Sequence, residues 1–363
     1  VHALRFVGYQ YALKAIQVQM SEHVKQSAGK LIFVIGNARS GTTMMGRILG
    51  NHPSVYTFHK ELHFFEKLWT WEDRNRKLSI PEALQCAAKL SCIAEDGFFT
   101  QGDHRVYKEK ALPIIQSIEE NALDLPRVYA AFLKHISAEN GKSIPCDQTP
   151  GYVYYIREIL ELFPEAKLIN MVRDPRDILL SQKKRWKRFW RPEQKLLELS
   201  VRTWMNYHPI STSRLWNAAV SAGCRARNER KILSVRYEDI VKDPEKEIKR
   251  ICAFIGISYN HKMLEVPMVG SSLISDTPEK TGIDRKRTAN WKEGGLNSAE
   301  LFLCQMLATH NMKRFGYKDT GVTPNPIFLL FYCMTFLPKL VISLFLHVKY
   351  IKNLSDAVSR RLI

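Results

Sequence analysis

The feature of this sequence with the clearest capacity for chemistry is a short loop between two glycines. Residues 31–35 are apolar and suit a strand, Gly36 and Gly41 enclose a polar stretch, and a helical pattern follows over residues 44–49. Exposed N–H groups at the start of such a helix, together with its dipole, favour a bound anion. The glycines have the spacing of the phosphate-binding loop G-x-x-x-x-G-K-[ST], but Thr42 occupies the lysine position.

The missing lysine constrains the kind of anion. Nucleoside triphosphatases use that lysine, with Mg²⁺, to neutralise a heavily charged terminal phosphate. A terminal sulfuryl group carries less charge, so loop amides, the hydroxyls of Ser40, Thr42 and Thr43, and the single cation Arg39 can suffice. The loop therefore predicts an anion site without a metal ion, and a glycine turn before an ordinary helix is the alternative.

A second candidate anchor follows another strand pattern at residues 167–172. Arg173 comes directly after it, Asp174 and Pro175 suit the cap and first position of a helix, and Ser181 lies farther along that helix. An arginine fork and a hydroxyl on one crevice form a phosphate clamp. Taken alone, the stretch is equally typical of a structural loop and cap.

These two anchors together resemble the sulfotransferases that use the donor PAPS (3′-phosphoadenosine-5′-phosphosulfate), over residues 31–317 and closest in motif to the carbohydrate or heparan type. The resemblance implies that residues 39–43, namely Arg39, Ser40, Gly41, Thr42 and Thr43, hold the 5′-phosphosulfate. It also implies that Arg173 and Ser181 hold the 3′-phosphate, and that no metal ion is needed.

Two later stretches resemble the same family. Tyr237, in Tyr-Glu-Asp after a strand pattern, matches an aromatic residue beside the adenine, although a core tyrosine would read the same way. The basic stretch 285–292 resembles the family's late arginine-lysine element, but its glycines are absent. We expect Arg285, with Arg287 as the rival, to contact the 3′-phosphate; a solvated basic loop is the alternative.

A catalytic base must remove the acceptor's proton as the acceptor oxygen or nitrogen attacks sulfur. Glu61 is the candidate, because Lys-Glu-x-x-Phe-Phe resembles the heparan-type enzymes, whose glutamate is the base. His59 and His63 are its rivals, and a helix-start carboxylate is the structural alternative. Lys60 is expected to help carry charge on the leaving group.

Two segments bear on the acceptor. Residues 147–152 resemble a segment that lines the acceptor side in carbohydrate-modifying members. Residues 183–191 interleave cations and aromatics, which suits an acidic acceptor, a membrane interface, a solvated helix face or nucleic acid. Membrane or acidic acceptor is favoured, and nucleic acid is not expected because no recognised module accompanies the segment.

The elements that must position these residues alternate between strand and helix. Strands are predicted over residues 31–35, 167–172 and 232–235, helices over 4–26, 125–138, 193–222, 243–255 and 298–313, and a long loop over 267–296. This pattern predicts an α/β fold, a phosphate-loop-type parallel sheet flanked by helices, followed by a C-terminal apolar helical segment. The expected divisions are an N-terminal helix (1–30), one catalytic domain (31–320) and a C-terminal segment (321–363).

Composition fits an anionic partner and reduced thiols. The 363 residues contain 54 Lys and Arg against 36 Asp and Glu, a formal charge of +18. The seven cysteines are dispersed without metal-binding spacing, so we expect mostly reduced, buried thiols; a single disulfide, for which Cys86 and Cys92 are one candidate pair, is the disfavoured alternative.

The C-terminal segment contains apolar runs at residues 327–337 and 340–346, separated by Pro338 and Lys339. Neither run reaches the ~20 residues of a spanning helix, so a re-entrant or interfacial hairpin with basic flanks is predicted. The protein is expected at a membrane, on its cytoplasmic face, or in the Golgi lumen if an N-terminal anchor precedes Val1. The acceptor is expected to be a carbohydrate, a glycolipid or another lipid-like molecule.

Two other function classes compete with sulfuryl transfer. A nucleotide kinase or phosphotransferase with a phosphate loop predicts lysine at position 42, where the sequence has threonine. A non-catalytic, basic membrane-binding or nucleic-acid-binding protein explains the charge but not the pairing of the Gly-Thr-Thr loop with Arg173 and Ser181.

Overall fold

The computed structural model describes residues 30–98, 102–189, 197–225, 230–268, 277–284, 288–348 and 354–362. The helix predicted over residues 4–26 and the two basic residues Arg285 and Arg287 lie outside these ranges. So do the last two residues of the basic and aromatic segment 183–191.

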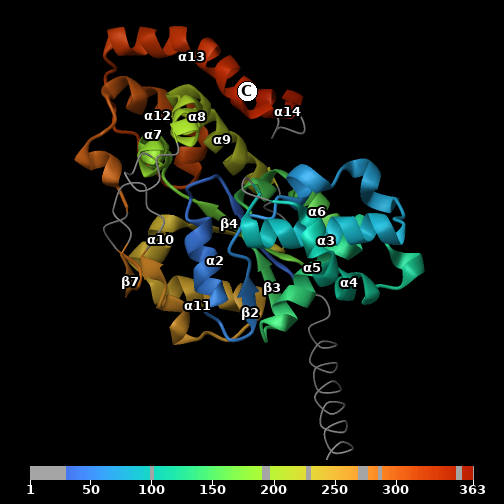
Figure 1. Cartoon of the computed structure of the whole chain (residues 1–363). Coiled ribbons are helices and arrows are strands. Elements are labelled where there is room, and N and C mark those ends of the chain that lie inside the picture. The colour runs from blue at the N-terminus through green and yellow to red at the C-terminus, as the bar shows by residue number, and fades with distance from the viewer. Residues whose placement is uncertain are drawn as a thin grey trace, which may run out of the picture.

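A five-stranded parallel sheet forms the centre of the molecule (Figure 1). Its strand order is β2-β3-β1-β4-β5. The strands are β1 (Ile32–Gly36), β2 (Val55–Thr57), β3 (Ile144–Asp147), β4 (Lys167–Val172) and β5 (Ile232–Arg236). All five residues of β1 are buried, as expected for a central parallel strand covered on both faces. The predicted α/β class and three of its strands are therefore confirmed.

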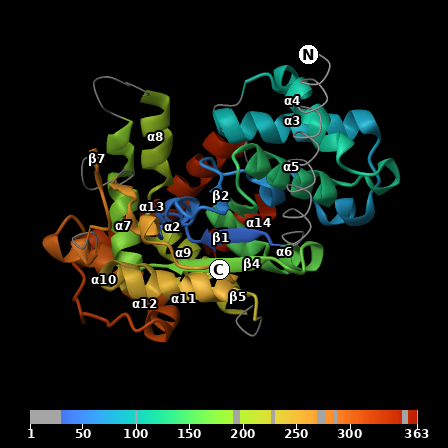
Figure 2. The same ribbon diagram turned by 90° about the horizontal axis from the view of Figure 1, so that it is seen from below.

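Thirteen α-helices are present in the described ranges. They are α2 (Thr42–Gly50), α3 (Ile80–Asp96), α4 (Lys108–Gln116), α5 (Leu125–Glu139), α6 (Ile156–Leu162), α7 (Pro175–Lys184), α8 (Leu197–Asn206), α9 (Pro209–Arg225), α10 (Tyr237–Lys242), α11 (Pro244–Ile255), α12 (Ser298–Arg314), α13 (Pro326–His347) and α14 (Leu354–Leu362). Figure 2 shows β1 and β4 between α3 and α5 on one side and α11 on the other.

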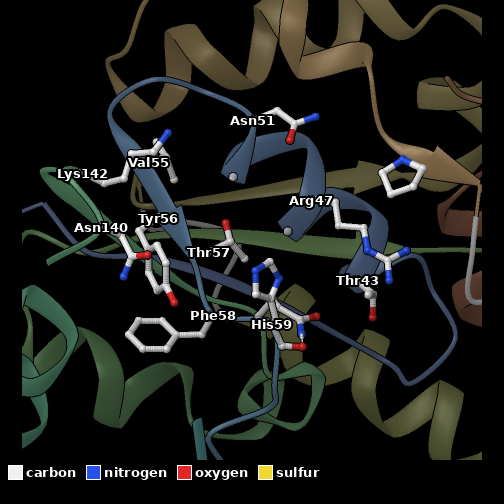
Figure 3. A pocket seen from close by; sticks show the side chains of 14 residues that line it. Thr43, Arg47, Asn51, Val55, Tyr56, Thr57, Phe58, His59, Asn140 and Lys142 are labelled. Carbon is white, nitrogen blue, oxygen red and sulfur yellow. Dashed lines mark hydrogen bonds between the residues drawn. The ribbon is translucent and has the colours of Figure 1, made fainter. Parts of the chain in front are cut away.

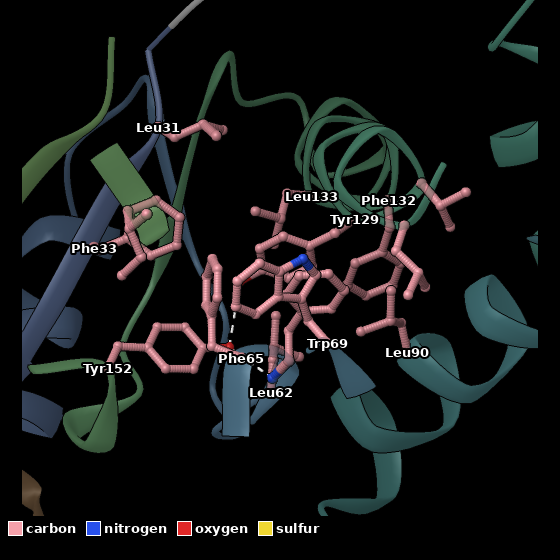
Figure 4. Close-up of a cluster of buried hydrophobic side chains, with 14 of the residues drawn as sticks. Leu31, Phe33, Leu62, Phe65, Trp69, Leu90, Tyr129, Phe132, Leu133 and Tyr152 are labelled. Atoms are coloured by element: carbon pink, nitrogen blue, oxygen red, sulfur yellow. Dashed lines mark hydrogen bonds between the residues drawn. The ribbon is translucent and has the colours of Figure 1, made fainter. Parts of the chain in front are cut away.

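Alternation along β1 divides the core into two layers. Ile32 and Val34 point into an aliphatic cluster with α2 and α11. Phe33 and Ile35 point to the other face, into a larger aromatic cluster with α3 and α5 (Figure 4). Within that cluster the rings of Phe64 and Tyr129 stack at 4.1 Å between centroids. This packing fixes the segment after β2, which carries the candidate base.

Two predicted elements differ from the structure. The helix predicted over residues 193–222 is two helices, because α8 ends at Asn206 and α9 starts anew at Pro209, a residue that cannot continue a helix but suits a first position. The loop predicted over residues 267–296 contains an antiparallel pair, β6 (Pro267–Met268) with β7 (Thr277–Thr281), and a short 3₁₀ turn, η9 (Asn290–Glu293).

The C-terminal apolar segment also differs from its prediction. Pro338 does not separate two short runs, since α13 continues through it for 22 residues. In the described part of the chain, α13 is the one helix long and apolar enough to cross a membrane by length and composition, and little of it is buried against the protein. Figure 1 shows α13 along an outer edge of the molecule, over α12 and α8.

The cysteines bear out the expectation of free thiols. All seven lie in described ranges and none forms a disulfide, so the Cys86–Cys92 pair is not made. Five of them are buried, and Cys333 on α13 is exposed.

Candidate active site

The loop between β1 and α2 has the backbone conformation that its glycines permit. Gly36 and Gly41 adopt φ values of 144° and 95°, which residues with a Cβ rarely reach. A Cβ at Gly41 would lie 2.5 Å from the ring of Tyr237, so the loop also needs glycine for space. Gly41 caps α2 without a side-chain hydrogen bond, which leaves the first amides of the helix to an anion.

Two side chains of this loop suit anion binding. Arg39 lies in the left-handed region at φ 73°, an unfavourable conformation for a residue with a long side chain. Such strain is concentrated at functional sites. Ser40 is fully buried, and within the described ranges its Oγ has no hydrogen-bond partner. A buried hydroxyl in this position fits an anionic ligand that would accept its hydrogen bond.

The two predicted anchors meet directly. Arg39 donates from Nε to Ser181 Oγ on α7 at 3.0 Å, across a separation of 142 residues. This contact forms because β1 and β4 are neighbours and their carboxyl ends lie at one edge of the sheet. Ser181 itself is buried, so its hydroxyl faces the loop rather than solvent.

Arg173 is held by contacts on several sides. Its guanidinium lies 4.3 Å from the ring centre of Tyr237 and 3.5 Å from Asp177 Oδ2. Burial raises the pKa of Asp177, and the positive charge of Arg173 opposes that rise. Tyr237 therefore connects the phosphate loop to the second anchor, because its ring packs against Gly41 and also contacts the guanidinium of Arg173.

Further contacts connect the second anchor to distant segments. Glu238, next to Tyr237, accepts hydrogen bonds from the Asp174 amide at 2.9 Å and from the Tyr317 hydroxyl at 2.8 Å. Asp177 accepts from the amides of Ala289 and Trp291, at 2.9 and 3.1 Å.

The backbone just after residues 285–287 is thus attached to α7, the helix that carries Ser181. The predicted roles of Arg285 and Arg287 remain predictions, because the residues themselves are not described.

The loop that carries Glu61 is fixed by the stretch after β3. Thr149 Oγ1 accepts a hydrogen bond from the amide of Leu62 at 3.1 Å, and the Tyr152 hydroxyl accepts from the amide of Phe64 at 2.8 Å. Glu61 and His63 each directly precede one of these two hydrogen-bonded residues in the sequence. The segment that resembled an acceptor-side element therefore positions the candidate base.

His63 lies between two carboxylates. Its Nε2 is 3.3 Å from Glu61 Oε2, and its Nδ1 pairs with Glu66 on η1 (Phe64–Leu68), a π-helical turn. Two of the three candidates for the base, Glu61 and His63, are thus in one cluster, and His59 is not part of it. Glu66 was not predicted; it stands three residues from His63, a spacing that could have suggested the pair.

The charges of this cluster shift its titration. Burial raises the pKa of Glu61, and the charges of Glu66 and Asp147 add to the rise while His63 and Arg185 oppose it. Burial would lower the pKa of His63, but the hydrogen bond to Glu66 and the nearby carboxylates outweigh it and raise the pKa. For Glu66 burial acts to raise the pKa, and the bond and charge of His63 outweigh it and lower the pKa.

Asp147 supports the cluster from the core. It is fully buried, and accepts from the Tyr129 hydroxyl at 2.5 Å and from the Thr149 hydroxyl at 2.6 Å. Burial raises the pKa of Asp147 to about 6, and these hydroxyls oppose the rise. Because the Thr149 hydroxyl donates its proton to Asp147, its oxygen is oriented to accept the hydrogen bond from the Leu62 amide.

Two further candidates, Lys60 and His59, lie on the surface, whereas Thr42 at the start of α2 is buried. Lys60 is exposed, and its positive charge helps to lower the pKa of Asp96 at the end of α3. The role of Lys60 at the leaving group stays a prediction. His59 is exposed as well, and its carbonyl is 3.5 Å from Gln148 Nε2.

A cavity of about 420 Å³ extends from the end of the phosphate loop along the groove between α2 and β2 (Figure 3). Thr43 and His59 line it with eight other polar or aromatic side chains: Arg47, Asn51, Tyr56, Thr57, Phe58, Asn140, Lys142 and Gln148. Gln148 is buried, and its Oε1 has no hydrogen-bond partner within the described ranges. No group of three or more metal-ligating side chains occurs in those ranges.

This arrangement can bind an anion with two charged ends, and His59, two residues before Glu61, lines the cavity along α2. The loop amides, Ser40 and Arg39 form one end, and Ser181 with Arg173 forms the other. A general base must lie near its target proton, and Glu61 and His63 are the predicted candidates that the structure brings together.

The matching family model, two similar proteins and a similar solved structure all carry a sulfotransferase description. A model described as "Sulfotransferase family" matches residues 32–261. A "Putative protein-tyrosine sulfotransferase" of Caenorhabditis briggsae is 24% identical over 273 residues, which are 72% of this chain and 80% of that protein.

An "Omega-hydroxy-beta-dihydromenaquinone-9 sulfotransferase Stf3" of Mycobacterium bovis is 25% identical over 245 residues, which are 62% of each chain. Among solved structures, a "Sulfotransferase Domain from the Curacin Biosynthetic Pathway" has 19% identity and a TM-score of 0.46, and covers 80% of this chain and 98% of that one.

Proposed function

Because this chain belongs to the sulfotransferase family, we propose that it transfers the sulfuryl group of PAPS to a hydroxyl or amine held beside Glu61 and His63. The predicted enzyme class is confirmed by the family match over residues 32–261, which speaks against a kinase and against a non-catalytic binding protein. The observation that carries the residue assignments is the contact between Arg39 and Ser181.

PAPS carries an anionic group at its 5′ end and another at its 3′ end, and each would bind one of the two anchors. Loop amides, Ser40, Thr42 and Thr43 would bind the 5′-phosphosulfate, and the Ser40 hydroxyl would gain the partner that it lacks within the described ranges. Arg173 and Ser181 would bind the 3′-phosphate. Arg39 is placed between the two ends, because its backbone is in the loop while its side chain reaches Ser181. The ring of Tyr237 packs against Gly41 of the first anchor and Arg173 of the second, and it would lie beside the nucleoside.

The transfer itself would be an in-line displacement. The acceptor oxygen or nitrogen forms a bond to sulfur while the bond from sulfur to the bridging phosphate oxygen breaks. The acceptor proton passes to the Glu61 carboxylate, and negative charge on the departing phosphate is stabilised by Arg39 and the loop amides. The products are the sulfated acceptor and adenosine 3′,5′-bisphosphate, and the base then releases its proton to water.

Glu61 is the preferred base because His63 is already engaged. A histidine paired with Glu66 and Glu61, with a raised pKa, tends to be protonated and would hold Glu61 in place rather than remove a proton. The raised pKa of Glu61 makes it a stronger base than an ordinary carboxylate. His59 and His63 remain rivals for this role.

The acceptor we propose is a carbohydrate or the sugar headgroup of a glycolipid, bound in the cavity along α2. Amide side chains of Asn51, Asn140 and Gln148 can bond sugar hydroxyls, Tyr56 offers an aromatic face, and Arg47 and Lys142 favour an acidic substituent. The buried Gln148 Oε1 would accept a hydrogen bond from such a ligand. The cavity begins at Thr43, next to the phosphate loop.

We also propose that the protein contacts a membrane through α13, on the cytoplasmic face. Support comes from the length and composition of the helix and from its many exposed apolar side chains. A lipid-linked acceptor would be within reach of an enzyme attached in this way.

The experiment that tests the proposed function uses PAPS labelled with ³⁵S and the purified chain. Incubation with separate lipid, glycan and protein fractions should label a carbohydrate-containing product, with adenosine 3′,5′-bisphosphate released in equal amount. Arg39→Ala should abolish labelling. Label confined to protein, or no transfer to either fraction, would contradict the proposed acceptor class.

A further inference from the structure

The helix α13 has two chemically different faces along its whole length. Seven apolar side chains spaced three or four residues apart form an outward stripe, and each is between 55% and 76% exposed: Ile327, Leu330, Met334, Leu337, Val341, Phe345 and Val348. This spacing places them on one side of a helix. We call these residues the outward stripe.

The opposite face is attached to the protein by polar contacts. Tyr332 accepts a hydrogen bond from Asn297 Nδ2 at 3.0 Å, Ser343 Oγ donates to Asn206 Oδ1 at 2.5 Å, and His347 Nε2 lies 3.0 Å from Asn206 Nδ2. These contacts are distributed over most of the helix. A helix crossing a bilayer here would carry α8, α9 and α12, against which it packs, into the hydrocarbon.

A second helix extends the exposed apolar surface. On α8, which packs against α13, Leu197, Val201 and Trp204 are 59%, 46% and 51% exposed and lie on one side of the helix. Lys339 of α13 places its ammonium 4.2 Å from the ring centre of Trp204, so a cation and an amphipathic aromatic ring lie where the two helices meet. Tryptophan and lysine side chains of this kind are favoured at the boundary of a bilayer.

From these observations we propose that α8 and α13 together form an in-plane membrane-binding surface for anionic lipid bilayers, in which α13 lies along the bilayer and does not span it. This proposal deepens the membrane contact proposed above and rests on it. The outward stripe and the α8 side chains enter the boundary between headgroups and acyl chains. The exposed cation Lys187, on the 3₁₀ turn η6 (Arg185–Arg188) that packs against α8, and Lys339 beside Trp204 would face the anionic headgroups.

A bilayer fits this surface better than a second copy of the chain. The stripe follows a helix about 33 Å long at 1.5 Å per residue. It lies beside Lys187 and Lys339 in a chain of formal charge +18, and an excess of positive charge opposes a symmetric dimer but favours an anionic bilayer. Sedimentation equilibrium in the absence of lipid should therefore give a monomer; a dimer that is lost when the stripe is altered would overturn the proposal.

Binding is measured by co-sedimentation of the full chain with vesicles of phosphatidylcholine, with and without phosphatidylglycerol. The chain should bind both and bind the anionic vesicles more tightly. Met334→Glu combined with Val341→Glu, both exposed positions, should weaken binding roughly tenfold or more. Trp204→Ala should weaken it by a smaller factor, whereas Trp71→Ala, at a tryptophan that is 43% exposed on η2 (Trp71–Asn75), should leave it unchanged.

Orientation is measured separately, with Cys333 as the starting point because it is the exposed cysteine of α13. In a Cys333→Ser background, Ile327→Cys and Phe345→Cys place a fluorophore at either end of the stripe. In-plane binding predicts that both are quenched by shallow spin-labelled lipids and that both are reduced by dithionite added outside the vesicles. Protection of one end alone would show a spanning helix and overturn the in-plane arrangement while leaving membrane contact intact. Failure to bind vesicles would overturn both.

Discussion

Arg39 and Ser181 are 142 residues apart in sequence, and the Nε of one donates to the Oγ of the other at 3.0 Å. The contact joins the loop after β1 to the helix after β4, which are neighbouring strands. It places a cation of the first anchor against a hydroxyl of the second. A nucleotide with charged groups at two positions would therefore meet both anchors at one edge of the sheet.

Replacing Arg39 tests this relationship through the reaction. Arg39→Ala should reduce kcat/KM roughly 10²–10³-fold, because it removes a cation that stabilises charge on the leaving phosphate. Arg39→Lys should recover part of that loss, since it restores the charge but not the fork. Lys313→Ala, at an exposed cation on α12, is the control and should be neutral. Near-normal turnover of Arg39→Ala would remove Arg39 from the site.

Gly41 tests the packing of the loop against Tyr237. Gly41→Ala should weaken binding of adenosine 3′,5′-bisphosphate, because a Cβ 2.5 Å from the Tyr237 ring must displace the loop or the ring. Stability should fall by about 1–3 kcal/mol.

Combining Gly41→Ala with Tyr237→Ala should relieve the overlap and restore part of the stability, measured by urea unfolding. Additive losses in the double variant would contradict the contact as the cause.

Glu61→Gln separates catalysis from donor binding. Turnover should fall about 10²–10⁴-fold, since the amide cannot accept the acceptor proton, while calorimetry finds unchanged affinity for adenosine 3′,5′-bisphosphate. In the parent enzyme, kcat/KM should decline as pH falls through a pKa above the ordinary value of 4.5, because burial raises the pKa of Glu61. If the variant retains full activity, His59 or His63 is the base.

His63 predicts a specific pH dependence of stability. Its pKa in the folded protein is raised above 6.5 by Glu66, so the charged form stabilises the fold fully below pH 6.5 and the effect is lost as pH rises through the folded pKa. On the acid side the same pair weakens as pH falls below 4.5 through the lowered pKa of Glu66.

His63→Gln should therefore cost about 1–3 kcal/mol near pH 6 and less at pH 9, measured by urea unfolding. A cost that grows with pH would contradict the pairing.

Much of the donor site could be predicted from sequence, because its signals are local. The glycine loop, the Asp174 cap and Pro175 at the first helical position follow from short-range backbone chemistry, and the structure has all three. The contact between Arg39 and Ser181 was not predicted; it depends on β1 and β4 being neighbours in the sheet.

Other features depend on long-range contacts. Glu66 gains its role only because His63 turns toward it in a left-handed backbone conformation, at φ 51°. Glu238 and Asp177 connect segments that no local pattern relates.

Strands β2 and β3 were missed because they are short and β3 contains Pro145, a residue unusual within a strand. The continuous α13 was missed because a proline usually ends a helix, yet an exposed helix can lose one hydrogen bond and continue.

Calorimetric titration with two nucleotides tests the two-anchor site most directly. Adenosine 3′,5′-bisphosphate should bind roughly 10–100-fold more tightly than adenosine 5′-monophosphate, and Arg173→Gln or Ser181→Ala should remove most of that preference. Equal affinity for the two nucleotides, or a preference that survives both substitutions, would contradict the site formed by Arg39, Arg173 and Ser181.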